Sequence, residues 1–162
     1  MQRRLYWNKP FFSNTYSIYA KDKRVGYLKE KPFSKSVYGQ LNGKQYIFRN
    51  TGFFSQKTKI IDGSSNKVIG EISYNSWMTK ANILAGNKEV KWKYDNLWHT
   101  KWRMILQEDT IITYASSSTR GTIETNTDDE LLLLSGLYIK NYYTQWIAVL
   151  IAIMVPLLIT NS

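Results

Sequence analysis

The sequence predicts a mainly β protein: a closed antiparallel barrel of about 12 strands wrapped around a hydrophobic central α-helix near the C-terminus. Three observations predict it. Polar and apolar residues alternate with the period of strands, similar segments recur about every 44 residues, and residues 130–159 carry almost no charge. Together they describe a barrel over residues 1–127, a plug helix of the same domain at 128–144 and an apolar tail at 145–162.

Internal repeats are the first of these observations. Segments beginning at Trp7, Phe48 and Trp92 share an aromatic residue, a short polar turn, an apolar-aromatic pair and then alternating residues. The pairs 44 positions apart are Gly26 and Gly70, Phe33 and Trp77, Phe48 and Trp92, Phe54 and Trp98, and Lys57 and Lys101. Because turn positions agree as well as hydrophobic ones, the chain is expected to repeat one supersecondary unit.

Strand-like alternation fills each repeat. In the segment 88–94, KEVKWKY, the side chains of Val90, Trp92 and Tyr94 share one face, and lysines occupy the other. Turn signals such as Asn42-Gly43 and Gly86-Asn87 separate about eleven or twelve such runs. A meander of this length should close into a barrel, because closure removes its unpaired edges. The aromatic side chains are expected to point inward.

The plug helix follows from the size of the barrel. About twelve strands enclose an interior too wide for their own side chains to fill. The leucine-rich segment after residue 130 is apolar on every side of a helix, as expected for a helix surrounded by protein or lipid. Its expected core residues are Leu131, Leu132, Leu133, Leu134, Leu137 and Tyr138. Thr127 with Glu130 fits a capping box at its start.

The apolar tail follows from helix length. Strands of five or six residues rise about 17 to 20 Å, whereas a helix over 131–159 would be about 43 Å long. The tail must therefore leave the barrel, and it is expected to anchor the chain in a membrane with the basic barrel on the cytoplasmic side. Tyr142, Tyr143 and Trp146 are the expected interfacial aromatics. Packing on the barrel mouth, or on a second copy, is the alternative. Nothing near the N-terminus fits a secretory signal.

The order of these elements resembles the tubby-like superfamily, which includes tubby C-terminal domains, LURP-one-related proteins and phospholipid scramblases. The resemblance is carried by VGYLKE, VIGEISY, TIITYAS, GTIET and DDELLLLSGLYIKNYY, and covers residues 5–144. It implies a twelve-stranded barrel threaded by a C-terminal helix, and binding of phospholipid. Scramblases carry a calcium-binding segment before that helix, where this chain has Asn126, Asp128 and Asp129. Three residues offer too few oxygen ligands for calcium, and helix capping explains them more simply. The cysteine-rich and proline-rich features of animal scramblases are absent.

The charge of the chain points to an anionic partner. The formal net charge is +10, from 22 Lys and Arg against 12 Asp and Glu. Such a balance favours nucleic acid or a phospholipid surface, and the apolar C-terminus favours lipid; nucleic acid is unlikely because the aromatic residues are expected inside. The candidate lipid-binding residues on the outward face are Lys57, Lys59, Lys91, Lys93, Lys101 and Arg103. A solvated cationic face kept for solubility is the alternative.

Catalysis finds no support in the sequence. The chain has no cysteine and one histidine, His99, and it shows no nucleophile motif, phosphate-binding glycine loop or metal-ligand spacing. No enzyme activity or cofactor is therefore expected. We expect a membrane-tethered domain that binds anionic lipid surfaces. The alternatives are a scramblase-like protein or intracellular lipid carrier, and a soluble structural or interaction domain.

Overall fold

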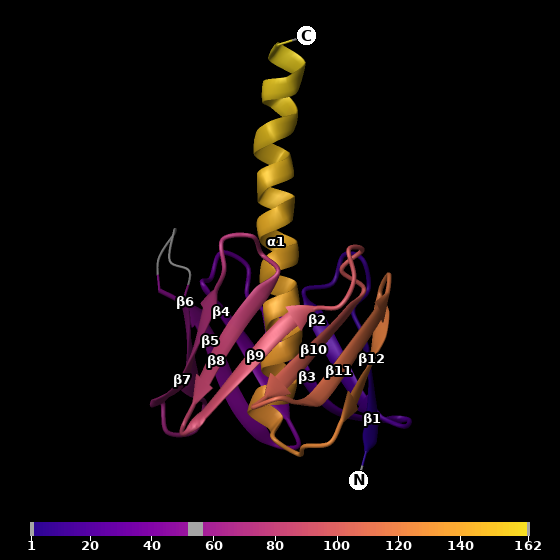
Figure 1. Cartoon of the computed structure of the whole chain (residues 1–162), viewed down its shortest axis with the longest axis vertical. Helices are drawn as coiled ribbons and strands as arrows, with labels where there is room; N and C mark the ends of the chain where they lie inside the picture. The colour runs from indigo at the N-terminus through magenta and orange to yellow at the C-terminus, as the bar shows by residue number, and fades with distance from the viewer. Residues whose placement is uncertain (1, 52–56, 162) are drawn as a thin grey trace.

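The computed structural model describes residues 2–51 and 57–161, and these form a closed antiparallel barrel around a single long helix (Figure 1). Each strand pairs with its neighbours in the sequence, and β1 pairs with β12 to close the barrel. The predicted fold class is confirmed. The strands are β1 (Arg3–Asn8), β2 (Thr15–Ala20), β3 (Lys23–Glu30), β4 (Ser36–Leu41), β5 (Lys44–Asn50), β6 (Lys57–Asp62), β7 (Val68–Tyr74), β8 (Lys80–Ala85), β9 (Lys88–Tyr94), β10 (Lys101–Leu106), β11 (Asp109–Ser117) and β12 (Arg120–Thr125).

The sequence repeat corresponds to groups of four strands. The pairing register shifts by one residue between β2 and β3, between β6 and β7, and between β10 and β11. Each shift is a β-bulge that sharpens the twist of the sheet. Gly26 and Gly70 lie directly beside the first two bulges, where a β-carbon would collide with a carbonyl oxygen of the next strand. The 44-residue spacing of these glycines therefore reflects close backbone approach. Phe54 lies outside the described residues.

Helix α1 (Glu130–Thr160) runs through the barrel and continues beyond it (Figure 1). Every side chain from Leu131 to Ile139 is buried, among inward residues of all twelve strands. The indole nitrogens of Trp92 and Trp102 both donate to the carbonyl of Gly136, at 3.2 and 3.1 Å. The alternating strands thus supply large aromatic rings that close the gap between the barrel wall and the helix.

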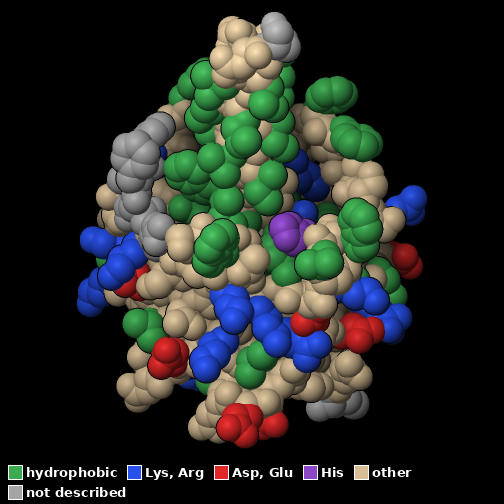
Figure 2. All heavy atoms as spheres, turned by 45° about the horizontal axis from the view of Figure 1, so that its top comes forward, with side chains coloured by type: hydrophobic (Ala, Val, Ile, Leu, Met, Phe, Trp, Pro, Cys, Tyr) green, Lys and Arg blue, Asp and Glu red, His purple; other side chains and the backbone are tan. Residues whose placement is uncertain are grey.

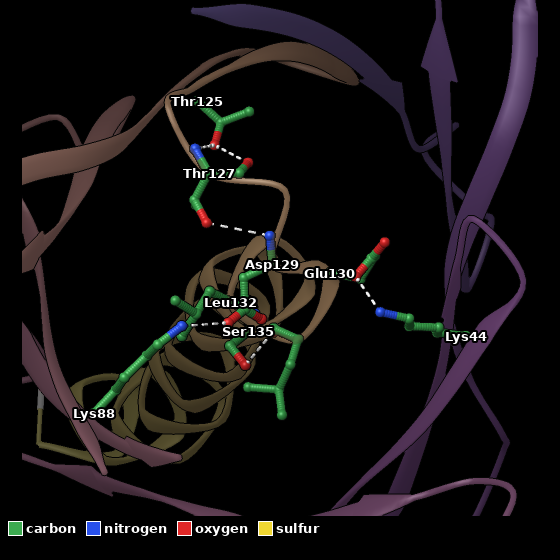
Figure 3. Close-up of polar contacts among 9 residues, drawn as sticks. Lys44, Lys88, Thr125, Thr127, Asp129, Glu130, Leu132 and Ser135 are labelled. Atoms are coloured by element: carbon green, nitrogen blue, oxygen red, sulfur yellow. Dashed lines mark hydrogen bonds and ion pairs between the residues drawn. The ribbon is translucent and has the colours of Figure 1, made fainter. Parts of the chain in front are cut away.

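The helix begins two residues later than a capping box at Thr127 would require, so that prediction is wrong. Asp129 is the N-cap, and its carboxylate accepts a hydrogen bond from the backbone N–H of Leu132 at 3.2 Å (Figure 3). The Thr127 hydroxyl instead accepts from the backbone N–H of Asp129. Thr125 in turn bonds the carbonyl of Thr127, which fixes the connection from β12. This turn delays the helical conformation until an aspartate, an equally good cap, is reached.

Three cations hold the acidic start of the helix, one from the first strand of each repeat. Lys44 at the start of β5 pairs with Glu130 at 3.1 Å, and Lys88 at the start of β9 pairs with Asp129 at 3.2 Å. In Figure 3 these lysines approach from opposite sides. Arg3, at the start of β1, pairs with Asp128 at 3.2 Å. The described residues contain no group of three or more His, Cys, Asp or Glu placed to hold a metal. Capping and ion pairing account for Asp128 and Asp129.

Candidate functional site at the end of the barrel where the helix emerges

The loops of the barrel fall into two sets at opposite ends, because consecutive strands are antiparallel. We call the end from which α1 projects the helix-exit end and the other the helix-entry end (Figure 1). Within the described residues, the helix-exit connections are residues 9–14, 31–35, 75–79, 95–100 and 118–119. The helix-entry connections are residues 21–22, 42–43, 63–67, 86–87, 107–108 and 126–129.

The second half of α1 is an exposed apolar rod. Trp146 and Ile147 are half-buried at the barrel mouth, and residues 148–161 are all exposed. By its length and composition α1 could cross a membrane, and its most apolar stretch is only 6% buried, unlike the core helix of a soluble protein. Among the described residues it is the one helix with this length and composition.

Two of the three expected interfacial aromatics lie elsewhere. Tyr142 and Tyr143 are buried inside the barrel mouth, where both rings contact Tyr74. Trp146 is the one that stays partly exposed at the point of exit. Strand length alone underestimates how much of the helix is covered, because the helix-exit loops extend the barrel along the helix beyond the last strand residues (Figure 1).

The charge of the protein is concentrated at the helix-exit end. Dividing each strand at its middle places thirteen Lys and Arg in the helix-exit half, with only two acidic residues, Glu30 and Asp95. The helix-entry half holds eight Lys and Arg and nine acidic residues, while Lys91 and Glu71 occupy strand middles. The two halves therefore carry formal charges of +11 and −1. Figure 2 shows a cluster of basic side chains on the wall below the emerging helix.

The structure brings four of the six predicted cationic residues together. Lys91 and Lys93 on β9 lie beside Lys101 and Arg103 on β10, with Lys93 directly opposite Arg103. The sequence analysis missed Lys80, which begins β8 and lies opposite Lys93 on its other side. Lys80, Lys91 and Lys93 line one open groove on the outer wall. Lys80 could have been predicted from the sequence, because β8 precedes β9 and pairs with it in a meander.

The remaining predicted residues are separate, and two of the six have acidic partners. Lys57 and Lys59 lie on β6, three strands away from β9. Lys57 pairs with Glu71 at 3.3 Å, and Arg103 pairs with Asp95 at 2.6 Å. Because partner charges reduce the field that these two residues present to a ligand, Lys80, Lys91 and Lys93 are the better candidates to contact an anion on this part of the wall.

His99 is held in a helix-exit loop by ring stacking. Its imidazole stacks on Tyr94 with ring centres 4.0 Å apart. Partial burial, aided by the positive charge of Lys140, lowers the pKa of His99. The ring makes no hydrogen bond to any side chain in the part of the chain that the structure describes. The arrangement offers a pH-sensitive packing contact, without the oriented acid or base that general acid-base catalysis needs.

Large hydrophobic side chains on the helix-exit loops are the main feature that the sequence analysis missed. Six of them are between 79% and 112% exposed, so the expectation that aromatic residues point inward is wrong for this set. We call them the rim hydrophobics: Phe11, Phe12, Phe33, Trp77, Leu97 and Trp98. Figure 2 shows exposed hydrophobic side chains beside the base of the projecting helix. These residues all lie within two positions of a Pro or Asn and outside the alternating runs, and this could have identified them as loop residues.

Comparison with protein-family models, with curated proteins and with solved structures gave no match. What this surface does must follow from its own chemistry.

Proposed function

We propose that this protein is a non-enzymatic domain that the apolar part of α1 tethers to a membrane, and that its barrel binds anionic lipid head groups through the helix-exit end. The observation that carries the proposal is the coincidence of two features: the exposed apolar helix emerges from the same end that holds thirteen basic and two acidic residues. Basic residues flanking a membrane segment favour the cytoplasmic side.

The location of the charge matters because membrane electrostatics act over a short range. A Lys or Arg near an anionic membrane surface contributes about 1 kcal/mol to binding. The field decays with a Debye length of about 8 Å at physiological ionic strength, and a barrel strand is about 20 Å long. Charges at the helix-entry end are therefore screened from a membrane at the exit end. The cations at the exit end are the ones within reach.

The barrel interior favours this proposal over a lipid carrier. A carrier needs a cavity that encloses an acyl chain, whereas the axis of this barrel is filled by α1, whose residues from Leu131 to Ile139 are all buried. Lipid could enter only if the helix left, and that would expose the whole core. Basic and exposed aromatic residues together also occur in single-strand nucleic-acid sites. Here they surround an apolar helix, which favours lipid.

The tether is tested with the full chain and one substitution. The parent should fractionate with membranes and resist extraction by alkali. Ile151→Lys places a charge in the middle of the exposed helix, at a cost of about 3 kcal/mol for a centrally buried Lys, and should weaken retention. Since Ile151 is exposed, the variant should melt like the parent in detergent. A parent chain that alkali releases would refute the tether.

The lipid preference is tested in the same Ile151→Lys background, where the tail no longer dominates binding. Vesicle flotation should improve with anionic lipid and decline as salt is raised. Reversing Lys93 and Lys101 to Glu at the helix-exit end should reduce anionic binding at least tenfold, by the estimate of about 1 kcal/mol per charge. Reversing Lys23 and Lys67 to Glu at the helix-entry end is the matched control. Equal losses from both pairs would argue against a site at the exit end.

A further inference from the structure

The rim hydrophobics occur at one end of the barrel only. They lie on four helix-exit loops, at positions 11–12, 33, 77 and 97–98, and their side chains are exposed. The six connections at the helix-entry end contain no hydrophobic residue at all. The helix-exit connections are mostly longer, with five or six residues where four of the helix-entry turns have two. A longer loop does not by itself need exposed aromatic side chains, so folding gives no reason for their presence. The contrast points to contact with an apolar partner at the exit end.

Two of these loops hold a tryptophan outward by the same hydrogen-bonded device. Residues 75–79 and 96–100 both read Asn-x-Trp-x-Thr. In each loop the Asn side-chain oxygen accepts from the backbone N–H of the Thr and of the next residue, at 3.0 to 3.2 Å. The Asn amide also donates to the Thr hydroxyl, at 3.0 and 2.7 Å. The loop is closed beneath its tryptophan, so the ring is presented outward without support from the core.

The length of the exposed helix brings these loops close to the membrane. The exposed apolar part, from about residue 147 to 159, is about 20 Å long at 1.5 Å per residue. A bilayer hydrocarbon core is about 30 Å thick. A short apolar segment thins the bilayer or draws its flanking residues inward. The flanking residues here are the rim loops, since α1 passes from barrel to tail without a break.

We infer that the rim hydrophobics enter the interfacial layer of the membrane and hold the barrel end-on against it. This inference rests on the proposed tether. Tryptophan is the side chain that most favours this layer, because its ring is apolar and its N–H can bond to water and head groups. The four loops follow β1, β3, β7 and β9, which lie on different sides of the closed barrel that α1 runs through. The cationic wall then lies just behind the rim, at the depth of the lipid phosphates.

A rigid connection makes this mode of binding favourable. If a flexible linker joined the domain to its anchor, loop contacts with the membrane would have to fix the orientation of the domain, which costs entropy. Here one helix serves as both the core of the barrel and the anchor, so its insertion fixes the orientation of the loops. The contribution of each rim residue adds to that of the anchor, as in linked binding sites. The membrane is therefore recognised by a preformed ring of loops around the helix.

Single cysteine labels test the inference in the full chain, because the sequence contains no other thiol. Phe12→Cys, Trp77→Cys and Trp98→Cys each place an environment-sensitive fluorophore on the rim and leave most rim hydrophobics in place. Leu158→Cys marks the exposed helix, and Asn87→Cys marks the helix-entry end. Each labelled chain is reconstituted in vesicles of phosphatidylcholine and phosphatidylglycerol, with and without lipids that carry a quencher near the head group.

The expected result is a blue shift at the three rim positions, with quenching several times stronger than at Asn87, whose label should report water. Rim labels that behave like Asn87, while Leu158 reports lipid, would overturn the inference and leave the tether standing. Rim labels that are shielded but not quenched would overturn it in favour of a protein contact or a second copy. A Leu158 label in water would refute the tether, and the rim inference with it.

Discussion

Gly136 is the point at which three wall residues meet the central helix. Its carbonyl accepts from Trp92 and Trp102, and its missing side chain leaves room for the ring of Tyr114. Complete burial raises the pKa of Tyr114 well above its usual value, so its hydroxyl stays protonated and donates to the carbonyl of Leu133 at 3.0 Å. A small residue within the leucine run could be predicted from the sequence to admit a wall residue. Which rings use the space depends on the register of the closed barrel.

Gly136→Ala should destabilise the fold strongly. The added methyl group would collide with the Tyr114 ring, which has packed neighbours and cannot withdraw. Overpacking of this kind costs about 1 to 3 kcal/mol or more. Ser135→Ala, at the next residue, is the control, because it removes only a bond to the carbonyl of Leu131 within the same helix. Thermal unfolding in detergent measures both. Equal melting temperatures for the two variants would contradict the packing at Gly136.

His99 should make stability depend on pH in a defined direction. Its pKa is lowered in the folded state, so the stacked imidazole favours the neutral form. The neutral imidazole contributes fully to the stability of the fold at pH values above the pKa of an unfolded His, about 6.5. This contribution is lost as the pH falls through the lower pKa of the folded state. His99→Asn should flatten this part of the stability curve, since Asn tolerates the positive φ at this position. Melting temperatures of both proteins between neutral and mildly acidic pH provide the comparison.

Helix α1 is one element in two environments, and its leucines show the difference. Leu133 is completely buried in the barrel, whereas Leu158 is largely exposed on the projecting part. Leu133→Arg would bury an unpaired charge, which costs more than a small domain can tolerate, so the chain should not fold. Leu158→Arg should fold with the parent's melting temperature in detergent, and it should hold less firmly to membranes. A folded, stable Leu133→Arg protein would show that the helix does not fill the barrel.

The elements differ in how far the sequence could predict them. Alternation predicted the strands well, because each strand has one face on the helix and one in water, as with Val90 and Lys91 on β9. The helix start was misplaced by two residues, since Thr127 and Asp129 are both good caps and only the turn from β12 decides between them. The rim hydrophobics were beyond the reach of periodicity, which does not describe loops.

The distribution of charge between the two ends is a property of the whole molecule, and most of it could have been predicted from the sequence. In a meander, alternate turns lie at opposite ends, so charges could have been sorted by end once the strands were known. The exposure of Trp77 and Trp98 could not be predicted from the sequence, because the burial of a loop residue depends on which loops fold back over the barrel. One end of the molecule therefore carries the exposed helix, the rim hydrophobics and most of the net positive charge, and the other end has polar connections and a net charge close to zero.

A truncated chain should separate the barrel from its proposed tether. A chain that ends after Ala148 keeps every buried residue of α1 and the half-buried Trp146 and Ile147. It should be soluble and melt within a few degrees of the full chain. Ending after Gln145 removes Trp146, which contacts Tyr142 and packs on the core, and should lower the melting temperature further. Aggregation of the longer truncation would mean that the exposed helix covers the barrel and does not serve as an anchor.

The closure of the barrel also sets the order in which the protein can fold. Arg3 in the first strand pairs with Thr125 in the last, and the segment that fills the interior follows that last strand. During synthesis the sheet can grow hairpin by hairpin, but its interior stays unfilled until α1 has been made. Pairing between distant segments is slow, and unfilled apolar surface exposed in the meantime promotes aggregation. Because one helix completes the core and carries the tail, the proposed tether would give the nascent chain its core and its membrane segment at the same stage of translation.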